Sequence, residues 1–133
     1  MNDAYYAYDS EGVPSITTDS HNIIGCMYNG YGVCESYAKS YTLLMTYLGY
    51  SVLEITGFGN GGPHAWNMIS IGNKYYLVDV TWDDDDKFGY EYRDIFFVRT
   101  QNEVLSTNET FGGTHLAETS FTYPSVSTTP YQE

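Results

Sequence analysis

Apolar side chains recur at intervals of three and four over residues 34 to 48, which is the period of one face of an α-helix. The stripe is formed by Cys34, Tyr37, Ala38, Tyr41, Leu44, Met45 and Leu48. Gly32 stands just before the stripe, and Gly49 stands where a glycine commonly ends a helix. The pattern predicts a helix over residues 33–48, with Cys34 near its N-terminus.

Further along the chain the pattern changes to short apolar or alternating runs, which are typical of β-strands. The runs are SVLEITGF (51–58), HAWNMISI (64–71), KYYLVDVTW (74–82), DIFFV (94–98) and, more weakly, SFTY near Phe121. The glycine-rich stretch GFGNGGP predicts a loop that flanks or rims a site, and residues 1–22 predict an irregular lead-in. One helix followed by antiparallel strands predicts an α+β fold, in a single domain over residues 1–133.

The Gly72-Asn73 pair lies between two strand-like runs and predicts a two-residue hairpin loop. In that register His64 faces Thr81 and Trp66 faces Asp79, so His64 and Asp79 are diagonal neighbours on one face. The backbones of such neighbours lie about 7–8 Å apart, which lets an imidazole and a carboxylate meet. The opposite face carries mostly core side chains, namely Ala65, Asn67, Ile69, Tyr76, Val78 and Val80.

This geometry predicts a thiol site. Asp79 would hold one ring nitrogen of His64 and favour the imidazolium, leaving the other nitrogen to face a thiol. The helix dipole and a cationic His64 would stabilise the Cys34 thiolate. A nucleophile, a base and an orienting group then follow one another along the chain.

Each of these residues also has a structural interpretation. Cysteines are often small buried hydrophobes, which is the interpretation favoured for Cys26. A disulfide between Cys26 and Cys34 would remove the nucleophile. Taken alone, His64 fits a structural histidine, and Asp79 fits a hydrogen-bonding group at a strand end.

Composition narrows the classes of partner. The 133 residues include 17 acidic and five basic side chains, a net charge of −12, which argues against nucleic acid and anionic membranes as partners. No apolar run approaches a membrane span, and no signal peptide is visible. Few lysines and fifteen tyrosines favour a secreted or surface protein of bacteria.

The metal-binding patterns are missing from the sequence. Two cysteines and three scattered histidines offer no zinc-ligand spacing, so we expect no metal and no cofactor. DDDDKFGYE does not fit the spacing of an EF-hand loop, and we expect residues 83–86 to form a solvated turn.

Three motifs together resemble the core of the transglutaminase-like superfamily: GVCESYA, HAWN and YYLVDVTWDD, in that order. The resemblance covers about residues 20–125 and is strongest over residues 30–84. It implies a papain-like cysteine-enzyme core, with the cysteine at the start of a helix packed on an antiparallel sheet. By motif, Cys34 corresponds to the nucleophile, His64 to the general base and acid, and Asp79 to its orienting group.

The flanking segments extend the resemblance. HNIIGCMYNGYGVC is similar to the approach to the cysteine in bacterial members, with Cys26 where a small residue is usual. RDIFFV is similar to the strand that follows, and His115 with Tyr123-Pro124 is similar to a late histidine and a Tyr-Pro ending. We assign His115 no role. Many members carry further helices before this part, so we expect one domain of a longer protein.

The remaining site residues follow from what acyl transfer requires. The Cys34 backbone N–H is expected to donate to the oxyanion, and Tyr28 or Asn22 could supply a second donor. Trp66 and Trp82 are expected either to wall the cleft or to pack in the core.

The resemblance implies thiol-dependent acyl transfer or hydrolysis at an amide bond of a protein or peptide, as in a cysteine peptidase, a deamidase or a transglutaminase. The charge favours a neutral or basic substrate segment. The alternative is a non-catalytic protein- or glycan-binding module on the same fold. Neither the acyl acceptor nor the oligomeric state follows from the sequence.

Overall fold

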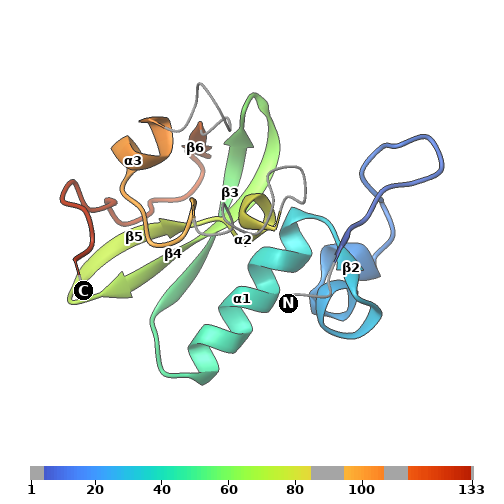
Figure 1. Ribbon diagram of the computed structural model, residues 1–133, viewed down its shortest axis with the longest axis horizontal. Coiled ribbons are helices and arrows are strands. Elements are labelled where there is room, and N and C mark those ends of the chain that lie inside the picture. The colour runs from blue at the N-terminus through green and yellow to red at the C-terminus, as the bar shows by residue number, and fades with distance from the viewer. Residues whose placement is uncertain (1–4, 85–94, 107–113, 133) are drawn as a thin grey trace.

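The computed structural model describes residues 5–84, 95–106 and 114–132, and these form an α+β fold with one long helix packed on an antiparallel sheet (Figure 1). The helix α1 spans Cys34–Tyr47, as the apolar stripe predicted. Val33 before it is extended, and Gly49 after it has a φ of 93°, which a glycine adopts without strain.

Four strands of the described residues form the main sheet, in the order β5-β4-β3-β6. Their bounds are β3 Val52–Gly59, β4 Gly62–Ile71, β5 Lys74–Val78 and β6 His115–Ala117. All neighbours in this sheet are antiparallel. The α+β prediction is confirmed.

The residues before α1 form a small separate unit beside its N-terminus, drawn in blue in Figure 1. The strands β1 (Tyr5–Tyr6) and β2 (Tyr31–Gly32) pair in parallel. Between them lie a 3-10 helix η1 (Asp19–His21) and a π-helix η2 (Gly25–Asn29). This unit brings Tyr5 and Tyr6 next to the residues that lead into α1.

The hairpin between β4 and β5 has the predicted register. Gly72 and Asn73 have φ values of 59° and 65°, so both adopt the left-handed conformation that a two-residue turn of this kind requires. Asn67 pairs with Val78 across the hairpin, as the register predicted. The preceding GFGNGGP stretch is also a tight hairpin rather than a loop, because β3 and β4 are joined by Asn60 and Gly61 alone.

Three strand predictions need correction. β5 ends at Val78, and residues 80–83 form the short helix α2 (Val80–Asp83), so the cross-strand pairs of His64 with Thr81 and of Trp66 with Asp79 do not form. Asp79 ends the strand because its Oδ1 accepts a hydrogen bond from Trp82 N at 3.1 Å and so caps this helix.

The predicted strand over residues 94–98 is a turn over its described part, 95–98. Val98 has a φ of 54°, which breaks an extended run, and only Arg99 forms a single bridge with Leu77. SFTY is also irregular, whereas β6 lies earlier, at residues 115–117. Asp94 lies outside the described residues.

The sheet is covered on both faces. One face packs against α1 through a cluster of buried residues: Tyr41, Ile69, Tyr76, Val78 and Val98. The other packs against the later part of the chain, including the helix α3 (Gln101–Ser106), through Ile55, Trp66, Met68, Leu77, Phe96 and Val104. The face that carries His64 is therefore also an interior face.

The acidic run after Trp82 is not a solvated turn where the structure describes it. Asp83 is buried and its Oδ1 accepts a hydrogen bond from Phe96 N at 2.8 Å, while Asp84 Oδ2 accepts one from the Tyr37 hydroxyl at 2.9 Å. These carboxylates fasten α2 to α1 and to residue 96. Asp85 and Asp86 lie outside the described residues.

No helix in the described parts of the chain is both long enough and apolar enough to cross a membrane.

Candidate active site

Cys34 is the first residue of α1, where the N–H groups of a helix point outward without an intrahelical acceptor. A Cβ atom on Gly32 would lie 2.6 Å from Ser36 Cβ and 2.8 Å from Cys26 Sγ, so only a glycine lets the chain pass this close to the helix. Cys34 is half-buried and Cys26 is buried, and both thiols are free. The disulfide alternative is therefore wrong, and Cys26 has the buried position that was predicted.

His64 and Asp79 meet as the hairpin register predicted. His64 Nε2 lies 2.6 Å from Asp79 Oδ2, with side-chain exposures of 7% and 2%. Because Nε2 faces the carboxylate, Nδ1 is the ring nitrogen that remains for another partner. The two residues meet although Asp79 lies at the end of β5 and not within a strand.

The mutual interaction of these two groups sets their charge state against the effect of burial. Burial disfavours a charged imidazole, but the Asp79 charge and hydrogen bond, with a smaller effect of the Cys34 thiol, raise the pKa of His64 to about 10. Burial also disfavours the carboxylate, but His64 and His115 lower the pKa of Asp79 to about 2. The pair is therefore an imidazolium and a carboxylate near neutral pH.

Cys34 and His64 line one cavity of about 590 Å³, beside the N-terminal end of α1. Other lining residues come from the N-terminal unit, from α1, from the end of β3 and from the segment after β6, among them Tyr6, Ile16, Glu35, Thr56, Phe58 and Glu118. The cavity is within the usual volume range of small-ligand sites. A thiol at a helix start and a charged imidazole thus face a common space.

The residues predicted for the oxyanion lie elsewhere. The Tyr28 side chain is 87% exposed, and neither Tyr28 nor Asn22 lines this cavity. Asn22 Oδ1 accepts a hydrogen bond from Ile24 N at 2.8 Å, and the Asn22 carbonyl accepts one from the Ser36 hydroxyl. Their part in catalysis remains a prediction that this geometry does not favour.

The two tryptophans differ in position. Trp82 stacks on His64 with ring centroids 4.8 Å apart and an interplanar angle of 18°, so it walls one side of the imidazole. Trp66 is 2% exposed and belongs to the core cluster behind the sheet. Trp82 therefore fits the first predicted interpretation, because it contacts the site. Trp66 fits the second, because it packs mainly in the core.

Two residues near the site were not predicted. Tyr6 lies on β1 and lines the cavity with Cys34, and burial together with the Cys34 thiol raises its pKa to about 12. His115 lies on β6, and its Nε2 is 2.8 Å from Asp79 Oδ2. The late histidine of the resemblance was the only signal for His115, and nothing in the local sequence marks Tyr6.

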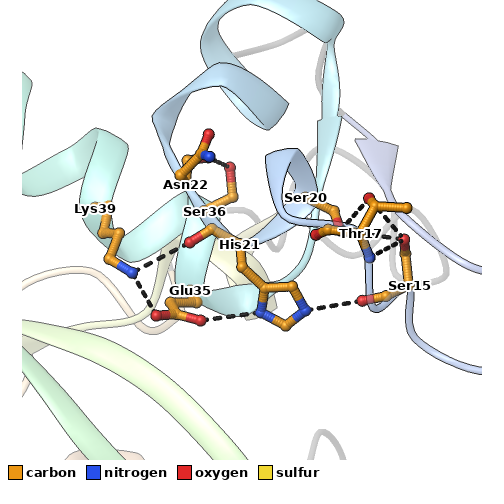
Figure 2. A network of polar contacts seen from close by, with 8 residues as sticks. All are labelled: Ser15, Thr17, Ser20, His21, Asn22, Glu35, Ser36 and Lys39. Carbon is orange, nitrogen blue, oxygen red and sulfur yellow. Dashed lines mark hydrogen bonds and ion pairs between the residues drawn. The ribbon is translucent and has the colours of Figure 1, made fainter.

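A second polar network includes Glu35, the residue that follows Cys34 in α1 (Figure 2). His21 Nδ1 is 2.9 Å from Glu35 Oε2, His21 Nε2 is 2.9 Å from the Ser15 carbonyl, and Lys39 pairs with Glu35 Oε1. Burial opposes the charge on Glu35, but Lys39 and His21 together lower its pKa. This network joins the N-terminal unit to the first turns of α1.

His64, Asp79 and His115 form the one group of potential metal-binding side chains found in the described residues, with donor atoms within 4.8 Å of one another. Imidazole and carboxylate are donor types that zinc and similar ions bind. In the structure these atoms are joined directly by the hydrogen bonds of 2.6 and 2.8 Å. We therefore describe the cluster as a hydrogen-bonded network.

Comparison with known proteins gives a likeness in structure. No family model matches the chain, and no curated protein matches it. A solved structure described as "Crystal structure of a TGase" is similar to it with a TM-score of 0.52 and 15% sequence identity. The match covers 59% of this chain and 22% of that chain, so this chain spans only a small part of that protein's length. The likeness shows a transglutaminase-like fold.

Proposed function

We propose that this protein is a thiol-dependent enzyme that acts at an amide bond of a protein or peptide. Cys34 is the nucleophile, His64 the general base and acid, and Asp79 the group that orients His64. The observation that carries the proposal is the buried contact of 2.6 Å between His64 Nε2 and Asp79 Oδ2, beside the cavity that Cys34 lines. A transglutaminase-like fold supports this assignment by analogy.

The first half of the reaction forms a thioester. Near neutral pH His64 already carries a proton on Nδ1, so Cys34 reacts as the thiolate partner of that imidazolium, and its sulfur attacks the carbonyl carbon of the amide. The C–N bond breaks as the His64 imidazolium donates its Nδ1 proton to the leaving nitrogen, which leaves His64 neutral. The acyl group is then bound to sulfur, and free ammonia or amine departs.

The second half depends on the acceptor. Water attacks the thioester to give a carboxylic acid, or a primary amine attacks to give a new amide. In both cases His64 takes the proton from the attacking group, and the sulfur leaves as the thiolate. Peptidase, deamidase and transglutaminase chemistry share the first half and differ only in the amide attacked and in this acceptor.

Two donors are proposed for the oxyanion. The Cys34 backbone N–H has no intrahelical acceptor because Cys34 is the first helical residue. Tyr6 lines the same cavity, and its hydroxyl keeps its proton because its pKa is raised to about 12. Tyr6 therefore replaces Tyr28 and Asn22 as the second proposed donor.

The cavity also supports a preference for neutral or basic peptide segments. Glu35 and Glu118 line it, and none of its described lining residues is a lysine or arginine. Ile16 and Phe58, which are 92% and 51% exposed, add apolar surface for a neighbouring side chain.

The test compares the two thiols of the same protein. Iodoacetamide at pH 6 should label Cys34 much faster than Cys26, because burial raises the pKa of Cys26 whereas Cys34 lies beside an imidazolium. Incubation with an amine-donor probe and glutamine peptides, scored by mass, then distinguishes crosslinking, deamidation and cleavage. Equal labelling of the two thiols would refute the proposal. Peptide binding without any thiol chemistry would favour the binding module instead.

A further inference from the structure

One carboxylate oxygen contacts two imidazole rings. Asp79 Oδ2 lies 2.6 Å from His64 Nε2 and 2.8 Å from His115 Nε2. Both Asp79 and His115 are nearly sealed from solvent, with side-chain exposures of 2% and 1%. The other oxygen, Oδ1, accepts the hydrogen bond from Trp82 N. The carboxylate is thus held by donors from β4, α2 and β6.

In this arrangement Asp79 Oδ2 has a second hydrogen-bond partner besides the His64 ring that it orients. A carboxylate turns easily about its terminal torsion, which is broad for aspartate. If His64 were the sole partner of Oδ2, that oxygen would be fixed in part by the ring that it has to orient. The Nε2–H of His115 supplies a contact to Oδ2 that is independent of His64.

His115 is itself firmly placed. It lies at the start of β6 and is paired with Gly59 of β3, and its carbonyl accepts a hydrogen bond from Gln101 Nε2 at 3.2 Å. Its ring packs on Trp82 with centroids 4.4 Å apart and meets Trp66 edge-on at 4.9 Å. The backbone and the aromatic rings together keep Nε2 directed at Asp79.

We propose that His115 is a positioning residue, whose Nε2–H fixes the Asp79 carboxylate so that Oδ2 faces His64. It acts on the Cys34 thiol only through Asp79. This inference rests on the proposed function, because it assigns a role within the same site. It also gives the segment after residue 114, which lies outside the three sequence motifs, a direct part in that site.

The test replaces His115 with two amide side chains of different length. In His115→Gln the amide nitrogen lies at the position along the side chain that Nε2 occupies, whereas in His115→Asn it corresponds to Nδ1 and falls short of Asp79. Loss of a hydrogen bond to a charged group changes an equilibrium or rate constant by roughly tenfold or more. We expect the iodoacetamide labelling rate of Cys34 at pH 6 to fall about tenfold in His115→Asn and to stay within about threefold of wild type in His115→Gln. Leu116→Ala, an exposed neighbour on β6, is the control and should label as wild type does.

A measurement on the unaltered protein keeps the inference testable even if His115→Asn does not fold. Nitrogen-15 NMR of the imidazole rings reports which ring nitrogen carries a proton. The inference requires a proton on Nε2 of His115 and a downfield N–H signal from its hydrogen bond. A His115 ring protonated on Nδ1 alone would overturn it.

A double-mutant cycle separates this inference from the proposed function. Because His115 acts through Asp79, His115→Asn should have no further effect on labelling in the Asp79→Asn background. Equal effects in the two backgrounds would overturn the positioning role alone, as would wild-type labelling in a folded His115→Asn protein. Wild-type Cys34 that labels no faster than Cys26 would instead refute the proposed function, and the role of His115 with it.

Discussion

Two histidine–carboxylate pairs lie near Cys34 and have almost the same contact distance. His64 Nε2 is 2.6 Å from Asp79 Oδ2, and His21 Nδ1 is 2.9 Å from Glu35 Oε2. The first pair has side-chain exposures of 7% and 2%, and the second has exposures of 40% and 37%. Water and salt screen the second pair but scarcely reach the first. Contact distance alone therefore does not rank the two pairs, whereas burial does.

The pairs also differ in how their carboxylates are held. Asp79 accepts from the Trp82 backbone and from two imidazoles, so its orientation is fixed from several directions. Glu35 is shared between His21 and Lys39 on a half-exposed surface, where long side chains lose rotamer freedom when they pair. A buried carboxylate with fixed donors can orient a ring for chemistry. An exposed and shared one can fasten two segments together.

Asp79→Asn is expected to have the largest effect, because it removes the charge from the buried pair and keeps its shape. The amide no longer stabilises the imidazolium and can hold His64 in the wrong tautomer. The corresponding change in a serine triad costs about 10⁴ in turnover. Since a thiol is more acidic than a hydroxyl, we expect a loss on the order of 10²–10³ in the thiol reaction that the mass assay detects.

Iodoacetamide labelling of Cys34 at pH 6 should also decrease in this variant. Asp19→Asn, an exposed aspartate that does not line the cavity, is the control and should label as wild type does. Equal labelling of the Asp79→Asn and Asp19→Asn proteins would show that the buried pair does not govern the thiol.

The sequence could predict the buried pair because its information is local. The Gly72-Asn73 turn fixes the hairpin register, and the register places His64 and Asp79 near each other within 16 residues of chain. The pair meets even though Asp79 leaves the strand to cap α2. The register of the hairpin thus predicts the contact between His64 and Asp79 even though the predicted length of the second strand was wrong.

The rest of the site depends on contacts that are distant in sequence. His115 reaches Asp79 through a three-residue strand whose residues show no strand periodicity, and Tyr6 reaches the cavity by pairing with β2. The apolar residues 95–98 suggested a strand, but they form a turn that includes the positive φ of Val98, and this turn buries Phe96 and Val98 while Phe97 is exposed. Apolar runs indicate burial, and only the tertiary fold decides the backbone conformation that provides it.

Gly59→Ala should disturb the buried pair without altering either partner. A Cβ atom at this position would lie 2.8 Å from His64 Cδ2 and 2.9 Å from Trp82 Cζ2, closer than real contacts allow. The imidazole must then shift by part of an ångström, and we expect Cys34 labelling at pH 6 to decrease about tenfold. Gly62→Ala is the matched control, because its Cβ would meet only Gly59 O at 3.9 Å. Similar labelling of both variants would mean that the position of His64 is not critical.

The buried pair should also make stability depend on pH. The pKa of His64 is raised to about 10, so its stabilising effect is complete below its unfolded pKa of 6.5 and is lost as the pH rises toward 10. The pKa of Asp79 is lowered to about 2, so its effect is present above 3.8 and is lost as the pH falls toward 2. Between pH 6.5 and 9.5 we expect the Tm of wild type to fall on the order of 5 °C more than that of Asp79→Asn. Parallel Tm curves for the two proteins over this range would contradict the raised pKa of His64.

Glu35→Gln is expected to have the smallest effect, because it breaks an exposed pair. Burial opposes the Glu35 charge, but Lys39 and His21 lower its pKa, so the carboxylate stabilises the fold above its unfolded pKa of 4.5 and loses this effect as the pH falls. Solvent screens the contacts of a side chain that is 37% exposed, and exposed pairs typically contribute about 0.2–1 kcal/mol. Urea unfolding at pH 7 should therefore show a loss of about 0.5 kcal/mol in low salt, and a smaller loss in high salt. A loss above about 2 kcal/mol that salt does not reduce would place the exposed pair in the same class as the buried one, and the distinction by burial would fail.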